Sequence, residues 1–475
     1  MKKKISINWF RQDLRVIDNP SLDSLTKSNL PILNIFIFDE INCKEKKLGE
    51  SSKVWLYHSL VNLDNLLDNK LHLYNGCAKE IIGELIKKYD VQKIVWNRCY
   101  EPWRIKRDIE IKSFLKINDI EVETFNGSLL WEPWEILKDD KTPYRVFTPY
   151  YRKGCLNFSE PRIPIKQPDT SLFFCESERK NINYLNLLPK KNWYKKLIKI
   201  WDISDGGVQN SIEYFFNHGI SNYKEGRNFP QKRNVSRLSP FLRWGQISPN
   251  ILWYNCEQLS SDKNVDHFKS ELGWREFSYY LLYHFPILPK KNLQKKFDNF
   301  PWVQNTNFLN SWQKGKTGYP IVDAGMRELW ETGYMHNRVR MIVGSFLVKN
   351  LLIDWKQGEE WFWDCLLDAD LASNSASWQW VAGSGADAAP YFRIFNPVTQ
   401  GQKFDKDGEY TKKFVPELKN LPSKYLFNPW ETPKDILSDS GIELGKNYPL
   451  PIVDIKTSRN MALEAFSSIK VEKDK

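Results

Sequence analysis

The chain has 475 residues, which is too long for a single hydrophobic core and predicts two or three domains. Its hydrophobic content of 41% fits a soluble globular protein. The formal net charge of +11 allows an anionic partner such as nucleic acid, but a lysine-rich solvated surface gives the same charge, so charge alone does not decide.

The cysteine pattern, the first residues and the short apolar segments indicate an intracellular protein. The seven cysteines are scattered and include no CxxC pair, which indicates reduced thiols rather than a disulfide framework or a zinc site. The six histidines show no HxxxH spacing, so we expect no metal. The start, MKKKISINWF, lacks the apolar core of a signal peptide, and the most apolar later segment, 341–348, is too short to span a membrane. We therefore expect a soluble cytoplasmic protein.

Residues 1–125 alternate between β-type runs and amphipathic helices. The runs lie at 5–10, 32–38, 93–97 and 122–125, and apolar helical faces lie at 56–67 and 81–86. Strands separated by helices predict a Rossmann-like parallel sheet covered on both faces. No glycine fingerprint follows the first strand, so we do not expect a conventional dinucleotide site in this half.

The rest of the chain changes character twice. Seven prolines break the periodicity between about 126 and 200, which predicts a long inter-domain connector. The sequence is then helical: Pro320 fits the first turn of a helix that Gly333 would end, and another helix begins near Asn337. We expect an α/β domain at 1–130, the connector at 131–201 and an all-α domain at 202–475.

Two stretches of the helical half suggest ligand contacts. Between 224 and 243 there are six basic residues against one acid, and Ser236 and Ser239 flank Arg237 as in a phosphate-binding loop. In the helix near Asn337, a polar stripe combines an Asn, an Arg, a Met and a Gly. A basic surface loop is an equally good interpretation of the first pattern. For the second, spacing alone slightly favours a solvated helix face.

Aromatic and acidic residues gather in two further places. Glu271, Trp274 and Arg275 share one helix face and could hold a base by stacking and hydrogen bonding, although a core Trp beside a surface ion pair would look similar. Residues 355–397 contain five tryptophans together with acids. For any single Trp an aromatic core is the better interpretation, but the combination needs a stronger explanation.

Three familiar motifs match only in part. GSGADA at 383–388 follows helical sequence rather than a strand, and GKT at 315–317 lacks the first glycine of a P-loop. Ser384 lacks the spacing of a nucleophile elbow, so nothing indicates a hydrolase.

Taken together, these residues resemble the DNA photolyase/cryptochrome family, and within it the class I cyclobutane pyrimidine dimer photolyases. The match is strongest over 223–420. The motifs that carry it are VSRLSPFLRWG (235–245), ELGWREF (271–277), GKTGYPIVDAGMREL (315–329), GYMHNRVRMIVGSFLVKNLLIDW (333–355) and DADLASNSASWQWVAGSGADAAPYFRIFNPVTQGQKFD (368–405).

The resemblance implies light-dependent repair of cyclobutane pyrimidine dimers in ultraviolet-damaged DNA. The implied cofactor is non-covalent FAD, active as FADH⁻, in the helical domain. An antenna chromophore, methenyltetrahydrofolate or a deazaflavin, is implied for the α/β domain, where 96–108 lie in the expected cleft. We expect a monomer that associates with the bacterial nucleoid through DNA.

The resemblance also assigns residues to FAD. Val235 stands where relatives often have Thr, which removes one hydroxyl contact. Asn374 corresponds to the Asn that faces flavin N5, and Arg340 to the partner of Asp368. The implied FAD contacts are Tyr223, Val235, Ser236, Arg237, Leu238, Ser239, Arg340, Asp368, Ala369, Asp370 and Asn374.

Lesion, DNA and electron-transfer residues are implied in the same way. The pocket for the flipped pyrimidines comprises Glu271, Trp274, Asn337, Met341, Asn374 and Trp380. The DNA contacts are Arg227, Glu271, Trp274, Arg275, Asn337, Arg338 and Gln400. The electron relay is Trp302, Trp355 and Trp378, with Trp312 as the alternative outermost member.

Two other activities occur in the same family. A cryptochrome-like blue-light photoreceptor is disfavoured because plant-type receptors tend to have Asp at the position of Asn374. A (6-4) photoproduct photolyase is disfavoured because that chemistry is thought to need histidine in the lesion pocket, and His336 is the only histidine within the long motifs.

Overall fold

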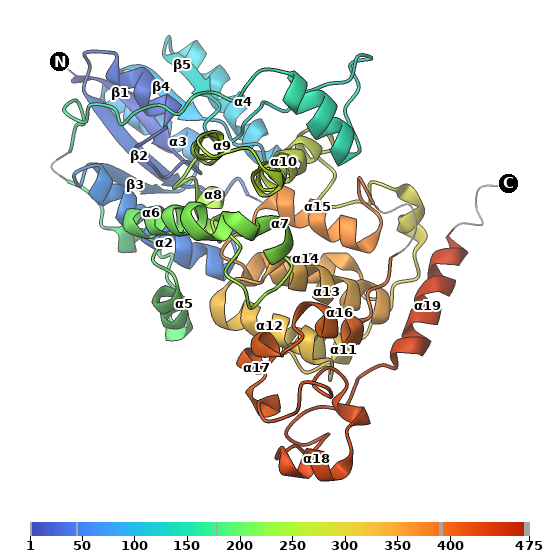
Figure 1. Ribbon diagram of the computed structural model, residues 1–475. Coiled ribbons are helices and arrows are strands. Elements are labelled where there is room, and N and C mark those ends of the chain that lie inside the picture. Colours follow the sequence, from blue (N-terminus) through green and yellow to red (C-terminus); the bar gives the residue numbers. More distant parts are fainter. Residues whose placement is uncertain (1, 44–45, 177, 389–392, 470–475) are drawn as a thin grey trace. The chain divides into compact units, whose positions relative to one another are not determined.

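The computed structural model describes residues 2–43, 46–176, 178–388 and 393–469 (Figure 1). Residues 389–392, which belong to the longest motif, lie outside the described part. The chain forms two compact units. The first unit comprises Met1–Asn217, Ser236–Pro286 and Leu367–Ala369, and the second comprises His218–Val235, Ile287–Leu366 and Asp370–Lys475. The domain boundaries at 130 and 201 remain predictions.

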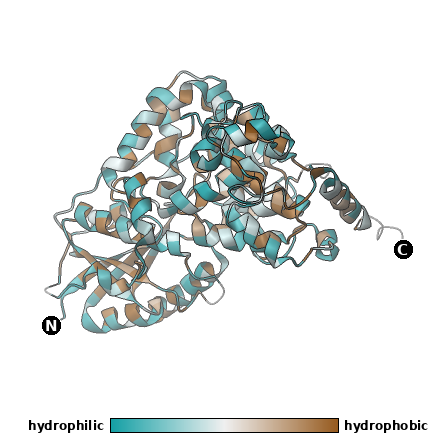
Figure 2. Ribbon diagram, turned by 90° about the horizontal axis from the view of Figure 1, so that it is seen from below, coloured by the Kyte–Doolittle hydropathy of each residue, from teal (hydrophilic) through white to brown (hydrophobic). Residues whose placement is uncertain are grey.

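The first unit contains a five-stranded parallel sheet with strand order β3-β2-β1-β4-β5. Its strands are β1 (Lys4–Phe10), β2 (Ile32–Phe38), β3 (Leu71–Asn75), β4 (Asp90–Asn97) and β5 (Glu121–Phe125). The predicted α/β class is confirmed, and the four expected strands are present within a few residues of their predicted bounds. β3 was not predicted. Figure 2 shows that the strands are largely hydrophobic, as expected of a sheet that is buried on both faces.

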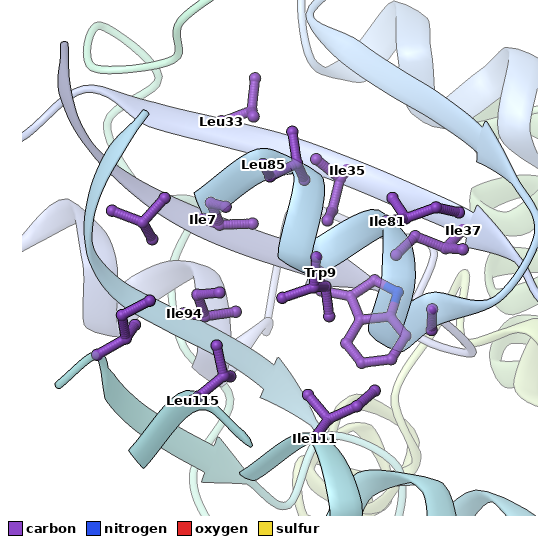
Figure 3. Packing of buried hydrophobic residues seen from close by; sticks show 14 of the residues in the cluster. Ile7, Trp9, Leu33, Ile35, Ile37, Ile81, Leu85, Ile94, Ile111 and Leu115 are labelled. Atoms are coloured by element: carbon purple, nitrogen blue, oxygen red, sulfur yellow. The ribbon is translucent and has the colours of Figure 1, made fainter. Parts of the chain in front are cut away.

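Helices supply the apolar residues that cover this sheet. Trp9, Ile35 and Ile94 from three strands pack with Ile81 of α3 and Leu115 of α4 in one buried cluster (Figure 3). The α-helices of the first unit are α1 (Pro20–Thr26), α2 (Glu50–Leu66), α3 (Ala78–Lys88), α4 (Pro102–Ile117), α5 (Lys195–Ile200), α6 (Asp205–Tyr214), α8 (Ser239–Trp244), α9 (Pro249–Glu257) and α10 (Lys263–His284).

The stretch expected as a connector is largely irregular but not simply superficial. It contains a π-helix at Pro149–Gly154, and both Tyr150 and Tyr151 in it are buried. Trp131 is buried as well, and Phe173 forms an isolated parallel bridge with Ile32 of β2. Aromatic residues that are rare in linkers therefore pack here as part of the first unit.

The second unit is helical, as predicted. Pro320 begins α12, and Gly333 ends it with a φ of 66°, the left-handed conformation that favours glycine. α13 begins at Asn337, also as predicted. The α-helices of the second unit are α7 (Tyr223–Gly226), α11 (Thr306–Gln313), α12 (Pro320–Thr332), α13 (Asn337–Ser345), α14 (Trp355–Cys365), α15 (Leu371–Ala382), α16 (Pro397–Phe404), α17 (Glu409–Phe414), α18 (Lys434–Asp439) and α19 (Ile455–Ser468).

The GKT stretch that resembled a P-loop is a turn held by Asp323 at the start of α12. Thr317 donates its backbone N–H and its hydroxyl to Asp323 Oδ1, at 2.6 and 2.7 Å. Tyr448 donates to Asp323 Oδ2 at 2.8 Å. These bonds satisfy a buried carboxylate, which gives the motif a structural role. Within the described part of the chain, no helix is long and apolar enough to cross a membrane.

Candidate functional site

The residues expected at functional sites are divided between the two units. The first unit holds Ser236, Arg237, Leu238, Ser239, Glu271, Trp274, Arg275, Asp368 and Ala369. The second holds Tyr223, Arg227, Val235, Trp302, Asn337, Arg338, Arg340, Met341, Trp355, Asp370, Asn374, Trp378, Trp380 and Gln400.

In the first unit, the loop before α8 has an unusual backbone. Arg237 has a φ of 55°, a conformation that is uncommon for residues other than glycine. Its guanidinium lies over the Trp201 ring at 4.3 Å, and such a cation–π contact stabilises the loop. The Ser236 hydroxyl accepts the Leu238 backbone N–H at 3.4 Å. Strained backbone of this kind is characteristic of ligand-binding loops.

The same loop meets a motif that lies far away in the sequence. Ser239 donates its hydroxyl to Asp368 Oδ2 at 2.7 Å. Arg243, in α8, donates Nε–H to the Ala369 carbonyl at 2.7 Å. Two motifs that are separated by more than a hundred residues are therefore joined at one place in the first unit, as their common assignment to FAD requires.

In the second unit, α15 carries Asn374 in a fixed orientation. The buried Asn374 side chain donates Nδ2–H to the Glu359 carbonyl at 2.9 Å, which leaves its Oδ1 as an acceptor. Asp370 caps the same helix by accepting the Ser373 backbone N–H at 2.7 Å. One oxygen of Asp370 thus has a structural role in addition to any contact with a ligand.

The N-terminal part of α13 carries cations with specific partners. Arg340 donates Nε–H to the Met335 carbonyl at 2.7 Å. Arg338 donates to Asn228 Oδ1, and its guanidinium lies over Phe404 at 4.4 Å. Burial, and next the charge of Arg227, lowers the pKa of Arg338. Positive charges are therefore crowded at this end of the helix, where a negatively charged ligand would relieve their repulsion.

The tryptophans of the expected relay are firmly held in the second unit. Trp378 contacts the Phe362 ring at 4.9 Å and the Trp312 ring at 6.2 Å. Trp355 donates Nε1–H to Asn292 Oδ1 at 2.9 Å. Trp302 is half-buried, whereas Trp312 is fully buried. Only Trp302 of these two has the solvent contact that an outermost relay member needs.

α10 in the first unit presents the expected lesion residues. The Trp274 ring stacks on Phe147 with ring centroids 3.8 Å apart and an interplanar angle of 12°. Arg275 pairs with Glu276 at 3.0 Å, and Glu271 lies 3.7 Å from His267. Phe147 covers one face of the indole and leaves stacking to its other face.

Neither Phe147 nor Glu276 was predicted as a site residue. Phe147 lies in the run YRVFTPY (144–150), and nothing in that sequence shows that its ring lies against Trp274. Glu276 is fully buried and accepts the Leu130 backbone N–H at 2.8 Å. Burial raises the pKa of Glu276 to about 7, against the lowering effect of Arg275. Only the tertiary structure reveals either feature.

The carboxyl ends of β1 and β4, where a doubly wound sheet binds its ligands, are closed by side chains of this chain. Arg11 pairs with Asp108, and Gln12 donates to Glu101 Oε1 at 2.6 Å. All four side chains are buried. A folate or deazaflavin at this position would have to displace these contacts, and an antenna chromophore at 96–108 stays a prediction.

The FAD assignment fits better. In the first unit, the loop that Ser239 joins to Asp368 and the strained Arg237 suit a phosphate-bearing ligand. In the second unit, the oriented amide of Asn374 offers an acceptor to a polar ligand. Among the described residues, no three His, Cys, Asp or Glu side chains are grouped so that they could hold a metal ion.

Comparison with known families gives two matches. Residues 6–169 match the family model described as DNA photolyase. Residues 268–468 match the model described as the FAD binding domain of DNA photolyase.

Individual relatives match along nearly the whole chain. A deoxyribodipyrimidine photo-lyase of Agrobacterium fabrum is 44% identical over 98% of both chains. Cryptochrome-2 of Arabidopsis thaliana is 34% identical over 98% of this chain and 79% of its own. The crystal structure of a bacterial class III photolyase from Agrobacterium tumefaciens superimposes with a TM-score of 0.94 at 43% identity, covering 99% of this chain and 98% of that one.

Proposed function

Because the chain belongs to the DNA photolyase/cryptochrome family, we propose that it is a deoxyribodipyrimidine photo-lyase that repairs cyclobutane pyrimidine dimers in DNA under blue light. The observation that carries the proposal is the fixed amide of Asn374, whose Nδ2 donates to the Glu359 carbonyl and whose Oδ1 remains an acceptor. Repair in this family begins from a reduced flavin, which carries a proton at N5, and a carbonyl oxygen is the partner that this proton needs.

The subclass that we propose is not the one that the motifs alone suggested. Those motifs suggested class I. A solved structure that is 43% identical over nearly the full chain belongs to a class III photolyase, and we propose that this chain is a class III enzyme as well.

We propose that FAD binds to the residues that the family motifs assign to it. The Ser236–Ser239 loop, joined to Asp368, would contact its phosphate and ribose groups. When bound and reduced, FAD would supply the electron that splits the dimer after absorbing light. Arg340, which is partly buried, would stabilise the negative charge of the reduced cofactor, because water screens its charge less than that of an exposed cation.

The family motifs assign the lesion contacts to Glu271 and Trp274 of the first unit and, separately, to Asn337, Met341 and Trp380 of the second unit. A dimer must leave the duplex to reach an enclosed cofactor, as in other base-flipping enzymes. Trp274 suits this task because Phe147 supports one face of its indole at 3.8 Å, so the ring keeps its orientation when the other face receives a pyrimidine. Arg227, Arg275, Arg338 and Gln400 would contact the DNA strand around the lesion.

For photoreduction we propose the relay Trp378, Trp355, Trp302. Trp302 is supported as the outermost member because it is half-buried, while Trp312 is fully buried and donates its indole N–H to the Val343 carbonyl at 3.0 Å. A monomer that acts on DNA in the cytoplasm also remains a proposal.

A blue-light photoreceptor is the second candidate, favoured by the 34% identity with Cryptochrome-2 of Arabidopsis thaliana. One experiment separates the candidates. Reduced protein is illuminated with oligonucleotides that contain either a cyclobutane thymine dimer or a (6-4) photoproduct, with dark samples as controls. The proposal predicts light-dependent repair of the cyclobutane dimer alone. Repair of neither lesion by protein with a full content of FAD would favour the photoreceptor, and repair of the second lesion would favour a (6-4) photolyase.

A further inference from the structure

His336, the residue that precedes α13, has a feature that the proposed function does not use. Its imidazole is buried, with 2% of the residue exposed. Nδ1 accepts the Arg338 backbone N–H at 3.3 Å and so caps the first turn of α13. The His336 backbone N–H donates to Glu328 Oε2 at 3.2 Å, and the same oxygen accepts the Tyr410 hydroxyl at 2.6 Å. The bond at Nδ1 orients the ring, and the backbone bond holds the residue in place.

The bond at Nδ1 determines which ring nitrogen carries the proton. Because Nδ1 is an acceptor, a neutral ring carries its proton at Nε2. Burial, and next the charges of Arg227, Arg338 and Arg340, lowers the pKa of His336 to about 3, so the ring is neutral at physiological pH. The Nε2–H group is therefore a buried donor, and no acceptor for it exists among the described residues.

A buried donor without an acceptor costs free energy, and such groups in native proteins usually have a reason. Here the surroundings indicate the kind of acceptor. His336 is the N-cap residue of α13, so it lies at the positive end of the helix dipole. Three arginines add their positive potential. A cation or a neutral donor would be repelled from Nε2–H, whereas an anionic oxygen would bind to it.

We propose that His336 binds a phosphate oxygen through Nε2–H and acts as a neutral donor beside the cations of Arg227 and Arg338. The proposal rests on the proposed function for the source of that phosphate, which is either the pyrophosphate of FAD or a phosphodiester of the DNA strand. Because the ring is neutral, it adds a directed hydrogen bond to the site without adding to the repulsion among the arginines.

Two substitutions separate the two nitrogens. In His336→Asn, the shorter amide can still cap α13 in the place of Nδ1, since Asn is a favoured N-cap residue, but nothing replaces Nε2–H. In His336→Gln, the longer amide places an N–H near the position of Nε2, while the cap is weakened. The proposal predicts that the Asn variant loses phosphate affinity by about tenfold or more and that the Gln variant retains most of it.

The measurement has one arm for each source of phosphate. In the first arm, release of FAD from the purified holoprotein is followed by the fluorescence of free flavin. In the second, the FAD-loaded protein binds a duplex oligonucleotide at several salt concentrations. If the Asn variant loses affinity for FAD but not for DNA, the phosphate is the FAD pyrophosphate. If it loses affinity for DNA but not for FAD, the phosphate is a phosphodiester of the DNA. In the DNA arm, the slope of affinity against salt stays unchanged, because a neutral donor releases no counterion.

Three outcomes would overturn the proposal. Both variants could bind FAD and DNA like the wild type. The Asn variant could bind normally while the Gln variant binds poorly, which would mean that His336 only caps the helix. Both could bind poorly and unfold at a lower temperature, which would mean that the ring is needed only for packing. Dimer repair by the wild type is measured separately, so the inference about His336 can fail or hold whatever the outcome for repair.

Discussion

The carboxylate of Glu276, in α10, lies beside the guanidinium of Arg275. It is fully buried, pairs with Arg275 at 3.0 Å and accepts the Leu130 backbone N–H. These bonds join the beginning of the expected connector to α10. Burial outweighs them and raises the pKa of Glu276 to about 7. This residue therefore changes charge in the pH range in which the protein would work.

The raised pKa predicts a pH-dependent contribution to stability. Between about pH 4.5 and pH 7 the folded protein holds a proton on Glu276 that the unfolded chain releases, so the contribution of this group to the free energy of unfolding falls as pH rises, by about 3 kcal/mol in total. Urea denaturation of the wild type and of Glu276→Gln at pH 5 and pH 8 measures it. The free energy of unfolding of the wild type, relative to that of the variant, should be lower at pH 8 than at pH 5. A difference that is independent of pH would contradict the raised pKa.

Trp378 gives a second test at the level of one residue. Trp378→Phe should abolish photoreduction of bound FAD, because the first step from the relay is lost, but it should leave dimer repair by chemically pre-reduced protein unchanged. Absorption spectra under blue light report the first activity, and restored thymine reports the second. Trp363→Phe, which changes a packing residue of α14, is the matched control and should retain both. Loss of both activities in the Trp378 variant would mean that the indole is structural.

The chemistry of single residues was predictable only through the family motifs. Asp368 and Asn374 stand in a long, specific run, which is why the sequence alone predicts a role for them. Phe147 and His336 were not assigned, because their roles depend on a stack with Trp274 and on a buried N–H group. Local sequence carries no signal of contacts between residues that are far apart along the chain.

At the scale of elements, the close packing of α14 on α15 depends on Gly358. A Cβ atom at this position would lie 2.2 Å from Trp378 Cη2 and 2.6 Å from Leu347 Cδ2, both of which are closer than any real contact. Glycine therefore lets the indole lie directly against the backbone of α14. Gly358 and Trp378 are therefore complementary in size, and a change of either one alone would disturb the packing of α14 on α15.

Gly358→Ala should accordingly lower the free energy of unfolding by about 1–3 kcal/mol, because the new methyl group forces the indole to move. It should also slow photoreduction. Gly83→Ala in α3 is the matched control, since its Cβ would lie 3.6 Å from the Phe114 ring, an ordinary contact, and alanine is favoured in a helix by about 1 kcal/mol. Urea denaturation compares them. Equal stability of the two variants would contradict the packing described for Trp378.

Periodicity predicted elements well where one face is consistently apolar. The strands at 32–38 and 93–97 and the helices that begin at Pro320 and Asn337 are of this kind. β3 was missed because it is a five-residue edge strand whose sequence, LHLYN, includes polar residues. α4 was missed because charged residues interrupt its apolar face. In both cases tertiary pairing or packing, rather than local pattern, determines the structure.

At the scale of the whole molecule, the net charge of +11 has a definite meaning if DNA is the substrate. Affinity should fall steeply with salt, since each phosphate contact releases counterions and contributes about −0.9 to the slope of log affinity against log salt. Arg338→Gln should reduce the magnitude of that slope by about one contact. Titration of a fluorescent duplex at several salt concentrations measures both. A slope near zero for the wild type would contradict a DNA-binding role for the basic residues.

The central claim is that the protein repairs cyclobutane pyrimidine dimers with light, and single-flash repair tests it most directly. Protein with one reduced FAD per chain is saturated with an oligonucleotide that contains one thymine dimer, and restored thymine is counted after each flash of blue light. The account predicts that thymine is restored with each flash until the dimer is consumed, and that none is restored in the dark. A full complement of reduced FAD with no restored thymine after prolonged illumination would contradict it.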